Sequence, residues 1–302
     1  MRRRTAGDAV KGRFPPGIRY MAGAAFGFSL MSLFVKIAGQ RLPTAEVVLA
    51  RGVVIVLVTR VLLWRAGIAP WGTRKGLLLF RGLFGFAAVG CFYYAIAHIP
   101  LADATVIQYT NPVWTALLAA AVLDEHLRPV EVVGTAACLA GVLLVARPSF
   151  LFGAESAHLD PLVAGIALAG SMLSAAAYVT VRKLGESEDA LVIVFYFALV
   201  STVGSFPVAA TEAVWPTGAE WLALLGVGVT AQAAQLLMTH GLKRERAGRA
   251  MAVGYLQIVF AGLWGALFFA EIPGLWSYAG AALVVAGTWM IGRRGTSGAA
   301  SA

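Results

Sequence analysis

The sequence predicts an all-α polytopic membrane protein, and three observations indicate this class. Of the 302 residues, 59% are hydrophobic and only 13% are charged, whereas a soluble domain carries about 25% charged residues. The mean hydropathy is +0.78. Uncharged apolar runs of about 20 residues, long enough to cross a bilayer as a helix, recur along the chain. A water-soluble globular domain is therefore excluded as the main body of the protein.

Ten membrane spans are predicted, and helix-ending residues mark the joints between them. Proline stands at several joints, as in RLP before Thr44, HIP before Leu101 and DP at 160–161, where it cannot continue the preceding helix. Most connections are short, so consecutive spans are expected to be antiparallel neighbours. The predicted spans are 18–36, 44–64, 76–95, 101–123, 130–146, 161–181, 190–209, 221–241, 250–269 and 274–292.

The basic residues fall between the apolar runs and indicate the orientation. If the N-terminus is cytoplasmic, 20 of the 24 Lys and Arg residues lie on the cytoplasmic side, and the exceptions are Lys36, Arg41, Arg51 and Arg147. The positive-inside rule then places both termini in the cytoplasm, and the expected location is a bacterial cytoplasmic (inner) membrane. Because the basic residues form no single patch or reading helix, the net charge of +9 does not indicate nucleic-acid binding.

An internal repeat divides the chain into two sets of five spans. An offset of 146 positions aligns residues 82–147 with 228–293 without a gap, and an offset of 142 pairs the first span with the sixth. Because five is odd, the second copy must enter the membrane in the opposite orientation, which gives the inverted repeats typical of secondary carriers. The predicted parts are a basic tail at 1–17, a first repeat at 18–147, an extracytoplasmic linker at 148–160, a second repeat at 161–293 and a tail at 294–302.

The fourth and fifth spans carry the most specific pattern in the chain. The run ADATVIQYTNPVWTALLAAAVLDEHLRPVEVVGTAACLAGVLLV, with a weaker echo from Ala250 to Ile291, resembles the paired modules of EamA-type carriers of the drug/metabolite transporter superfamily. The resemblance implies ten helices, cytoplasmic termini, a central cavity enclosed by both repeats, and transport of small metabolites inward or outward. Ile258 replaces Pro112 in the second copy, so we expect that half to lack the helix break.

Polar side chains within the spans are the candidates for substrate binding, because such groups are costly in hydrocarbon and usually face the interior of the bundle. Gln108, Asn111 and Thr115 form one helical stripe, and Pro112 leaves the Gln108 carbonyl without its helical donor, free for a ligand or water. Interhelical hydrogen bonding without any ligand is the alternative for each residue. The substrate-binding candidates are Gln108, Tyr109, Asn111, Thr115, Gln232, Gln235, Tyr255, Gln257, Trp264 and Tyr93.

Ionisable side chains narrow the expected substrate. No Asp, Glu, His or Lys lies at the middle of a predicted span, and we expect no deep cluster of Lys or Arg. This pattern disfavours a cation/proton antiporter and a carrier for polyanions, and favours a zwitterionic or neutral polar metabolite such as an amino acid. The gating or coupling candidates are Glu46, Arg51, Asp103 and Pro112, and simple interfacial contact with water is the alternative for the three charged residues.

Several further residues have expected structural roles. Glu125 and Glu271 recur in the tight loops of the two repeats and are expected to cap the next helix. The glycines of the fifth and tenth spans indicate close helix packing, and Cys91 and Cys138 are expected to be free thiols. The serines Ser29, Ser32, Ser171 and Ser174 are expected to bond to the backbone of their own helices.

The function predicted from these features is transport by alternating access. A membrane-embedded enzyme and a channel or scaffold are the alternatives. The sequence has no HExxH, GxSxG or GxxxxGK[ST] motif and no Cys/His cluster, so we expect neither an enzyme nor a metal or cofactor. The expected partners are a small-molecule substrate and the lipid bilayer, with the protein a monomer or weak homodimer.

Overall fold

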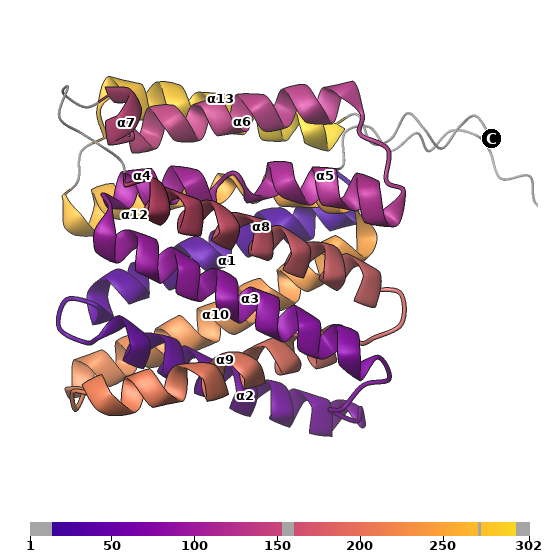
Figure 1. The fold of residues 1–302 in the computed structure, drawn as a ribbon, viewed down its shortest axis with the longest axis vertical. Helices are drawn as coiled ribbons and strands as arrows, with labels where there is room; N and C mark the ends of the chain where they lie inside the picture. The colour runs from indigo at the N-terminus through magenta and orange to yellow at the C-terminus, as the bar shows by residue number, and fades with distance from the viewer. Residues whose placement is uncertain (1–13, 153–159, 271–272, 294–302) are drawn as a thin grey trace, which may run out of the picture.

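The protein is a bundle of long helices (Figure 1), seen in a computed structural model that describes residues 14–152, 160–270 and 273–293. Two spans are each built from two helices, α4 (Leu101–Gln108) with α5 (Asn111–Leu123), and α11 (Ala247–Val253) with α12 (Leu256–Phe269). The other eight spans are single helices: α1 (Pro16–Ala38), α2 (Thr44–Ala66), α3 (Lys75–His98), α6 (Pro129–Ala146), α8 (Pro161–Leu184), α9 (Ala190–Glu212), α10 (Gly218–Arg244) and α13 (Leu275–Arg293). A short helix, α7 (Ser149–Phe152), follows α6. The ten predicted spans are thus confirmed.

Some of the predicted features lie outside the described residues. These are most of the tail at 1–17, most of the linker at 148–160, the tail at 294–302, and Glu271. The domain boundaries and the capping role of Glu271 therefore stay predictions.

The helix ends follow from local sequence. The Asp160 side chain accepts a hydrogen bond of 2.8 Å from the Leu162 N–H and caps α8. Thr217 and Glu220 form a capping box at the start of α10. Gly67 ends α2 with φ 66°, a left-handed conformation that glycine adopts without steric cost.

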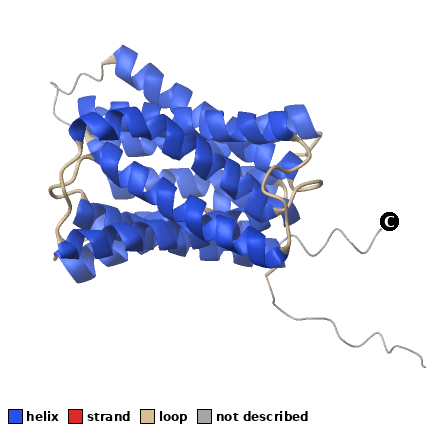
Figure 2. Cartoon of the chain, turned by 90° about the horizontal axis from the view of Figure 1, so that it is seen from below, coloured by secondary structure: helices blue, strands red, loops and turns tan. Residues whose placement is uncertain are grey.

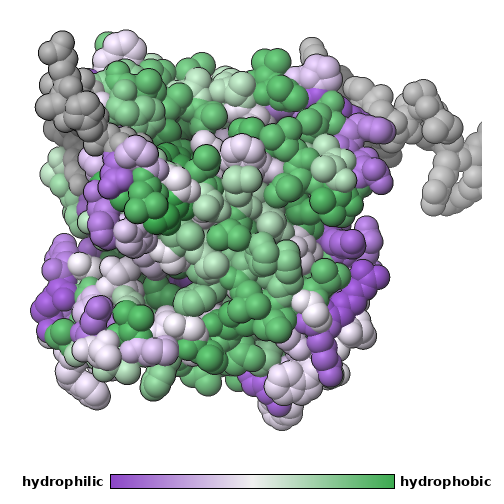
Figure 3. Space-filling model, viewed as in Figure 1, coloured by the Kyte–Doolittle hydropathy of each residue, from purple (hydrophilic) through white to green (hydrophobic). Residues whose placement is uncertain are grey.

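The surface is apolar around the middle of the bundle and hydrophilic at the two ends of the helices (Figure 3). Large apolar side chains point outward, including Leu57, Leu222 and Phe268, which are 61%, 71% and 62% exposed. In water such a surface would be strongly unfavourable, whereas in hydrocarbon it is not. The protein is an integral membrane protein.

Each membrane-spanning helix packs most extensively against a helix of the other repeat. The pair α6 and α13 forms one edge of the bundle and the pair α2 and α9 forms the opposite edge (Figure 1), with α1 on α10 and α3 on α8 between them. The loops gather at the two ends of the helices (Figure 2). The two repeats are therefore interleaved rather than placed side by side as separate lobes.

The contact between α6 and α13 displays the pseudo-two-fold relation of the repeats. A Cβ at Gly141 would lie 2.5 Å from the Gly280 carbonyl oxygen, and a Cβ at Gly280 would lie 2.5 Å from the Gly141 carbonyl oxygen. Gly134 and Gly287 face each other in the same way. The predicted close packing of these glycines is confirmed, and because each contact recurs 146 positions along the chain, the duplication of five helices is confirmed as well.

Both repeats contain a break in a membrane-spanning helix. The first lies between Gln108 and Asn111, and the second lies at Gly254 and Tyr255. The expectation that the second half lacks a break because Ile258 replaces Pro112 is wrong. Gly254, a poor helix former, stands there, and the N–H of Gly254 bonds to the carbonyl of Met251, three residues back, at 2.9 Å. The helix tightens at this point without proline.

Candidate functional site

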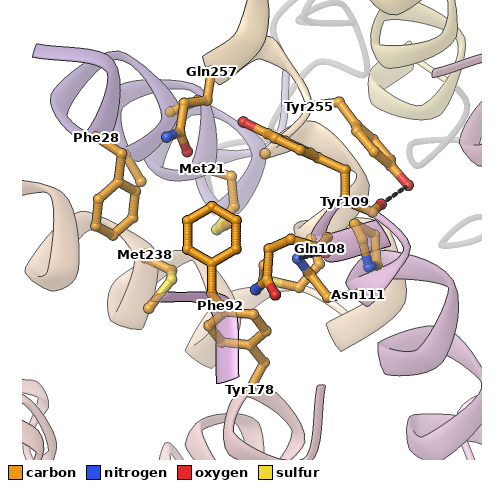
Figure 4. A pocket seen from close by; sticks show the side chains of 15 residues that line it. Met21, Phe28, Phe92, Gln108, Tyr109, Asn111, Tyr178, Met238, Tyr255 and Gln257 are labelled. Carbon is orange, nitrogen blue, oxygen red and sulfur yellow. Dashed lines mark hydrogen bonds between the residues drawn. The ribbon is translucent and has the colours of Figure 1, made fainter. Parts of the chain in front are cut away.

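The two helix breaks meet at a central cavity. Its first lobe has a volume of about 240 Å³. The break in the first repeat supplies Gln108, Tyr109 and Asn111 to this lobe, and the break in the second supplies Tyr255 and Gln257 (Figure 4). Apolar side chains complete the walls, and the larger ones are Met21, Phe28, Phe92, Met238 and Met251.

A second lobe, of about 180 Å³, continues the first. The two lobes share five lining residues, Phe28, Phe92, Gln108, Tyr178 and Gln257. The second lobe adds Arg51 of α2, Arg81 of α3 and Gln235 of α10. One end of the combined cavity is thus lined by amides and phenols, and the other carries guanidinium groups.

Hydrogen bonds hold the first break in place. The Asn111 Nδ2 group donates to the Gln108 carbonyl at 2.8 Å, so the carbonyl that Pro112 leaves without a helical donor is bonded by a side chain rather than left free as expected. The Gln108 Nε2 group donates to Ser174 Oγ of α8 at 3.1 Å. The side-chain oxygens of Gln108 and Asn111 have no partner within the described chain and remain available to a ligand.

The two predicted phenols lie against each other. The Tyr109 and Tyr255 rings stack with centroids 5.9 Å apart and planes 22° apart. The Tyr255 hydroxyl donates to the Tyr109 carbonyl at 2.8 Å, whereas the Tyr109 ring extends toward Gln257 (Figure 4). Equivalent residues of the two repeats thus meet at the pseudo-two-fold axis, where they take different roles.

Most of the substrate-binding candidates line the cavity, namely Gln108, Tyr109, Asn111, Gln235, Tyr255 and Gln257, together with Arg51 and Pro112 of the gating or coupling set. Three others do not. Thr115 is fully buried and donates to the Asn111 carbonyl at 2.7 Å, Trp264 donates to Ser29 Oγ at 3.0 Å, and Tyr93 packs beside Phe92.

Gln232 and the acidic candidates also lie outside the lining. Gln232 is buried, with neither side-chain atom bonded within the described chain. Glu46 accepts a hydrogen bond of 3.0 Å from the Val214 N–H, and buried Asp103 accepts from the N–H and hydroxyl of Ser149, the first residue of α7. The acidic candidates therefore bond to the backbone of other segments and do not pair with Arg51 or with each other.

Arg81 is the functional candidate that sequence reasoning missed, because it was counted among the cytoplasmic flanking residues. It lies six residues into α3, about 9 Å along the axis, and only 3% of it is exposed. Arg81 and Arg51 both line the second lobe. The expectation that no basic cluster lies deep in the bundle is therefore wrong. One sequence signal was available: both arginines precede a glycine inside an apolar run, in RGVVI and RGLFG.

Two structural predictions need correction. Glu125 does not cap the helix that follows it. Its carboxylate accepts from the Ala247 N–H at 2.7 Å, at the start of α11 in the other repeat, and from Arg182 Nε at 3.0 Å.

Of the serines, Ser171 and Ser174 bond to the first helix break instead of their own helix, whereas Ser29 and Ser32 bond to their own backbone as expected. Both cysteines are free thiols, as predicted.

Comparison with known proteins identifies the family. The sequence profile of the EamA-like transporter family matches residues 15–147 and again residues 162–293. The chain belongs to this family. A relative of this EamA-like chain in Pseudomonas aeruginosa, named pseudopaline exporter CntI, is 33% identical over 270 residues, which cover 89% of this chain and 93% of the relative. The human solute carrier family 35 member G1 is 32% identical over 297 residues, covering 94% of this chain and 81% of that protein.

A solved crystal structure shares the fold of this EamA-like protein. It superposes with a TM-score of 0.74 at 21% identity and covers 89% of this chain and 95% of that chain. The family and the names of these relatives are those of transporters, and they support membrane transport as the activity of this chain.

Proposed function

We propose that the protein is a secondary carrier that moves a small polar or zwitterionic metabolite, an amino acid or a related compound, across the cytoplasmic membrane of a bacterium. Both termini face the cytoplasm in this proposal, as the positive-inside rule predicts. The two inverted repeats alternate between two arrangements, each of which opens the central cavity to one side of the membrane.

One observation carries the proposal: the helix breaks of both repeats line a single cavity near the pseudo-two-fold axis. Broken helices at the junction of inverted repeats are where secondary carriers bind their substrates. The lining supports a polar compound, because amide and phenol groups face apolar walls of Met and Phe. The name of the Pseudomonas relative makes export the first direction to test.

The proposal is tested first in cells and then with purified protein. Metabolites inside and outside cells that overproduce the protein are compared with those of cells that carry an empty vector. A compound whose distribution changes is then used, isotope-labelled, for counterflow in proteoliposomes. We expect saturable uptake that preloaded unlabelled compound accelerates, as alternating access requires. Linear flux without exchange would instead indicate a channel, and chemical conversion of the compound would indicate an enzyme.

The variant Asn111→Leu gives the matching test of the site. It removes both the unpartnered cavity oxygen and the donor to the Gln108 carbonyl, so we expect transport to fall at least about 30-fold, the equivalent of about 2 kcal/mol. Leu57→Ala, at an exposed position on α2, is the control and should transport normally. A well-folded Asn111→Leu protein with normal flux would place the site elsewhere.

A further inference from the structure

The second lobe of the cavity contains two arginines for which the described part of the chain supplies no counter-charge. The Nε–H groups of Arg51 and Arg81 are buried and have no hydrogen-bond partner. In residues 14–152, 160–270 and 273–293, neither guanidinium forms a hydrogen bond or an ion pair. Among the same described residues, none that lines either lobe is acidic. An uncompensated charge is strongly unfavourable in a low-dielectric interior, so these residues are costly unless they have a binding role.

The packing of α9 brings both arginines to the cavity. The glycine after each arginine is a point of close approach to α9: a Cβ at Gly82 would lie 2.7 Å from the Val200 side chain, and a Cβ at Gly52 would overlap Thr202. With these glycines turned toward α9, the neighbouring arginine side chains reach the space between the helices. In each Arg-Gly pair, the guanidinium group therefore lies next to a close contact between the helix that carries it and α9.

The surroundings of Arg81 make room for its guanidinium group. A Cβ at Gly85, one turn further along α3, would overlap Arg81 Nη1, so only glycine leaves this space. The guanidinium carbon lies 4.2 Å from the ring centre of Phe197, a stabilising cation–π contact. Tyr178 lines the same lobe as both arginines. Arg81 is therefore held in place while its polar edge is left unbonded.

The rest of the cavity offers acceptors. Gln108 Oε1, Asn111 Oδ1 and Gln235 Oε1 are buried and unbonded within the described chain. A ligand that satisfies the cavity therefore presents acceptor groups to the arginines, and N–H or O–H donors to the amides. The planar guanidinium fork matches the two oxygens of a carboxylate.

We propose that the substrate is a small organic anion, with a net negative charge, whose carboxylate groups bind Arg51 and Arg81 and whose hydroxyl or ammonium groups bind the amide oxygens. This inference deepens the proposed transport function and rests on it. It replaces a neutral or net-zwitterionic substrate with one that compensates the buried charge of the cavity.

The test determines the net charge of the compounds that the protein transports. Cells that overproduce the full-length protein, Arg81→Gln, Arg51→Gln or Arg60→Gln are compared by metabolite profiling. Arg60 also lies on α2 but is exposed, so it is the matched control. We expect the compounds redistributed by the wild type to be anionic at neutral pH. Either cavity variant should reduce the change at least about 30-fold, and Arg60→Gln should retain it.

A second measurement separates binding from folding. Because Arg81→Gln removes an uncompensated buried charge, the purified variant should unfold at the same temperature as the wild type or at a higher one. Lost transport with a lower unfolding temperature would give Arg81 a structural role and overturn the inference. Redistribution of neutral or cationic compounds, or full transport by Arg81→Gln, would overturn it while leaving the carrier function intact. No redistribution by the wild type would overturn the proposed function itself.

Discussion

The two repeats form opposite walls of one cavity and give it different chemistry. The first repeat supplies both arginines. The positions 146 residues further on hold Phe197, which lines the cavity, and Val227, which is buried in an apolar cluster outside it. The backbone contacts around them are nevertheless equivalent. Gly82 packs against Val200, and its counterpart Gly228 packs against Val54. The comparison teaches that symmetry is retained where helices pack against each other, and that it is lost at the side chains that give the cavity its charge.

Placing an arginine at the equivalent position of the second repeat should have the largest effect on stability. Val227 is fully buried and packs in an apolar cluster with Leu42 and Leu224. Val227→Arg buries a charge without the space that Gly85 gives Arg81, so we expect a loss of about 3–5 kcal/mol of stability. The measurement is the yield of monodisperse protein and its thermal unfolding. Val227→Met, which adds size without charge, is the control, and a stable Val227→Arg protein would show that both repeats tolerate a charge at this position.

The glycines between α6 and α13 test the symmetric region. In Gly141→Ala and Gly280→Ala the new methyl group meets the carbonyl oxygen of the opposite glycine, so each variant should lose about 1–2 kcal/mol. The two unfolding temperatures are compared in detergent. Equal losses are expected from the reciprocal contact, and a large loss in one variant alone would contradict the symmetry of this interface.

The smallest expected effect on stability is the difference between Phe variants of Tyr109 and Tyr255. Tyr255→Phe removes the donor to the Tyr109 carbonyl, and we expect it to lower the free energy of unfolding by about 1 kcal/mol. Within the described chain the Tyr109 hydroxyl forms no hydrogen bond, so Tyr109→Phe should be nearly neutral for stability. Chemical denaturation of both variants checks the contrast. Equal effects would mean that the two phenols have the same role.

Much of the fold could be predicted from the sequence. Hydropathy, proline at the joints and the 146-residue offset are local or periodic signals, and they predict ten spans and their duplication without knowledge of packing. The second helix break is not predicted, because Ile258 stands where the first repeat has Pro112. At Gly254 the helix tightens through hydrogen bonds between residues three apart, which composition alone does not reveal.

The candidate site could be predicted only in part, because a stripe of polar residues continues on one face only while the helix is regular. Thr115 follows the break after Gln108 and bonds to the backbone of its own helix instead of lining the cavity. Arg81 is predicted to lie on the cytoplasmic side with most of the other basic residues. Its true position depends on the glycines that draw α3 against α9, and this contact between distant segments is not visible in a linear sequence.

The reciprocal glycine contact of α6 and α13 has a consequence for the origin of the binding site. Such a self-complementary contact is what an isologous dimer forms from two identical chains. Two identical five-helix subunits would present every residue twice, and the cavity would then hold four arginines rather than two. Joining the halves in one polypeptide allows one copy to lose its charges while the shared interface is kept, so covalent fusion permits a cavity suited to a small, lightly charged molecule.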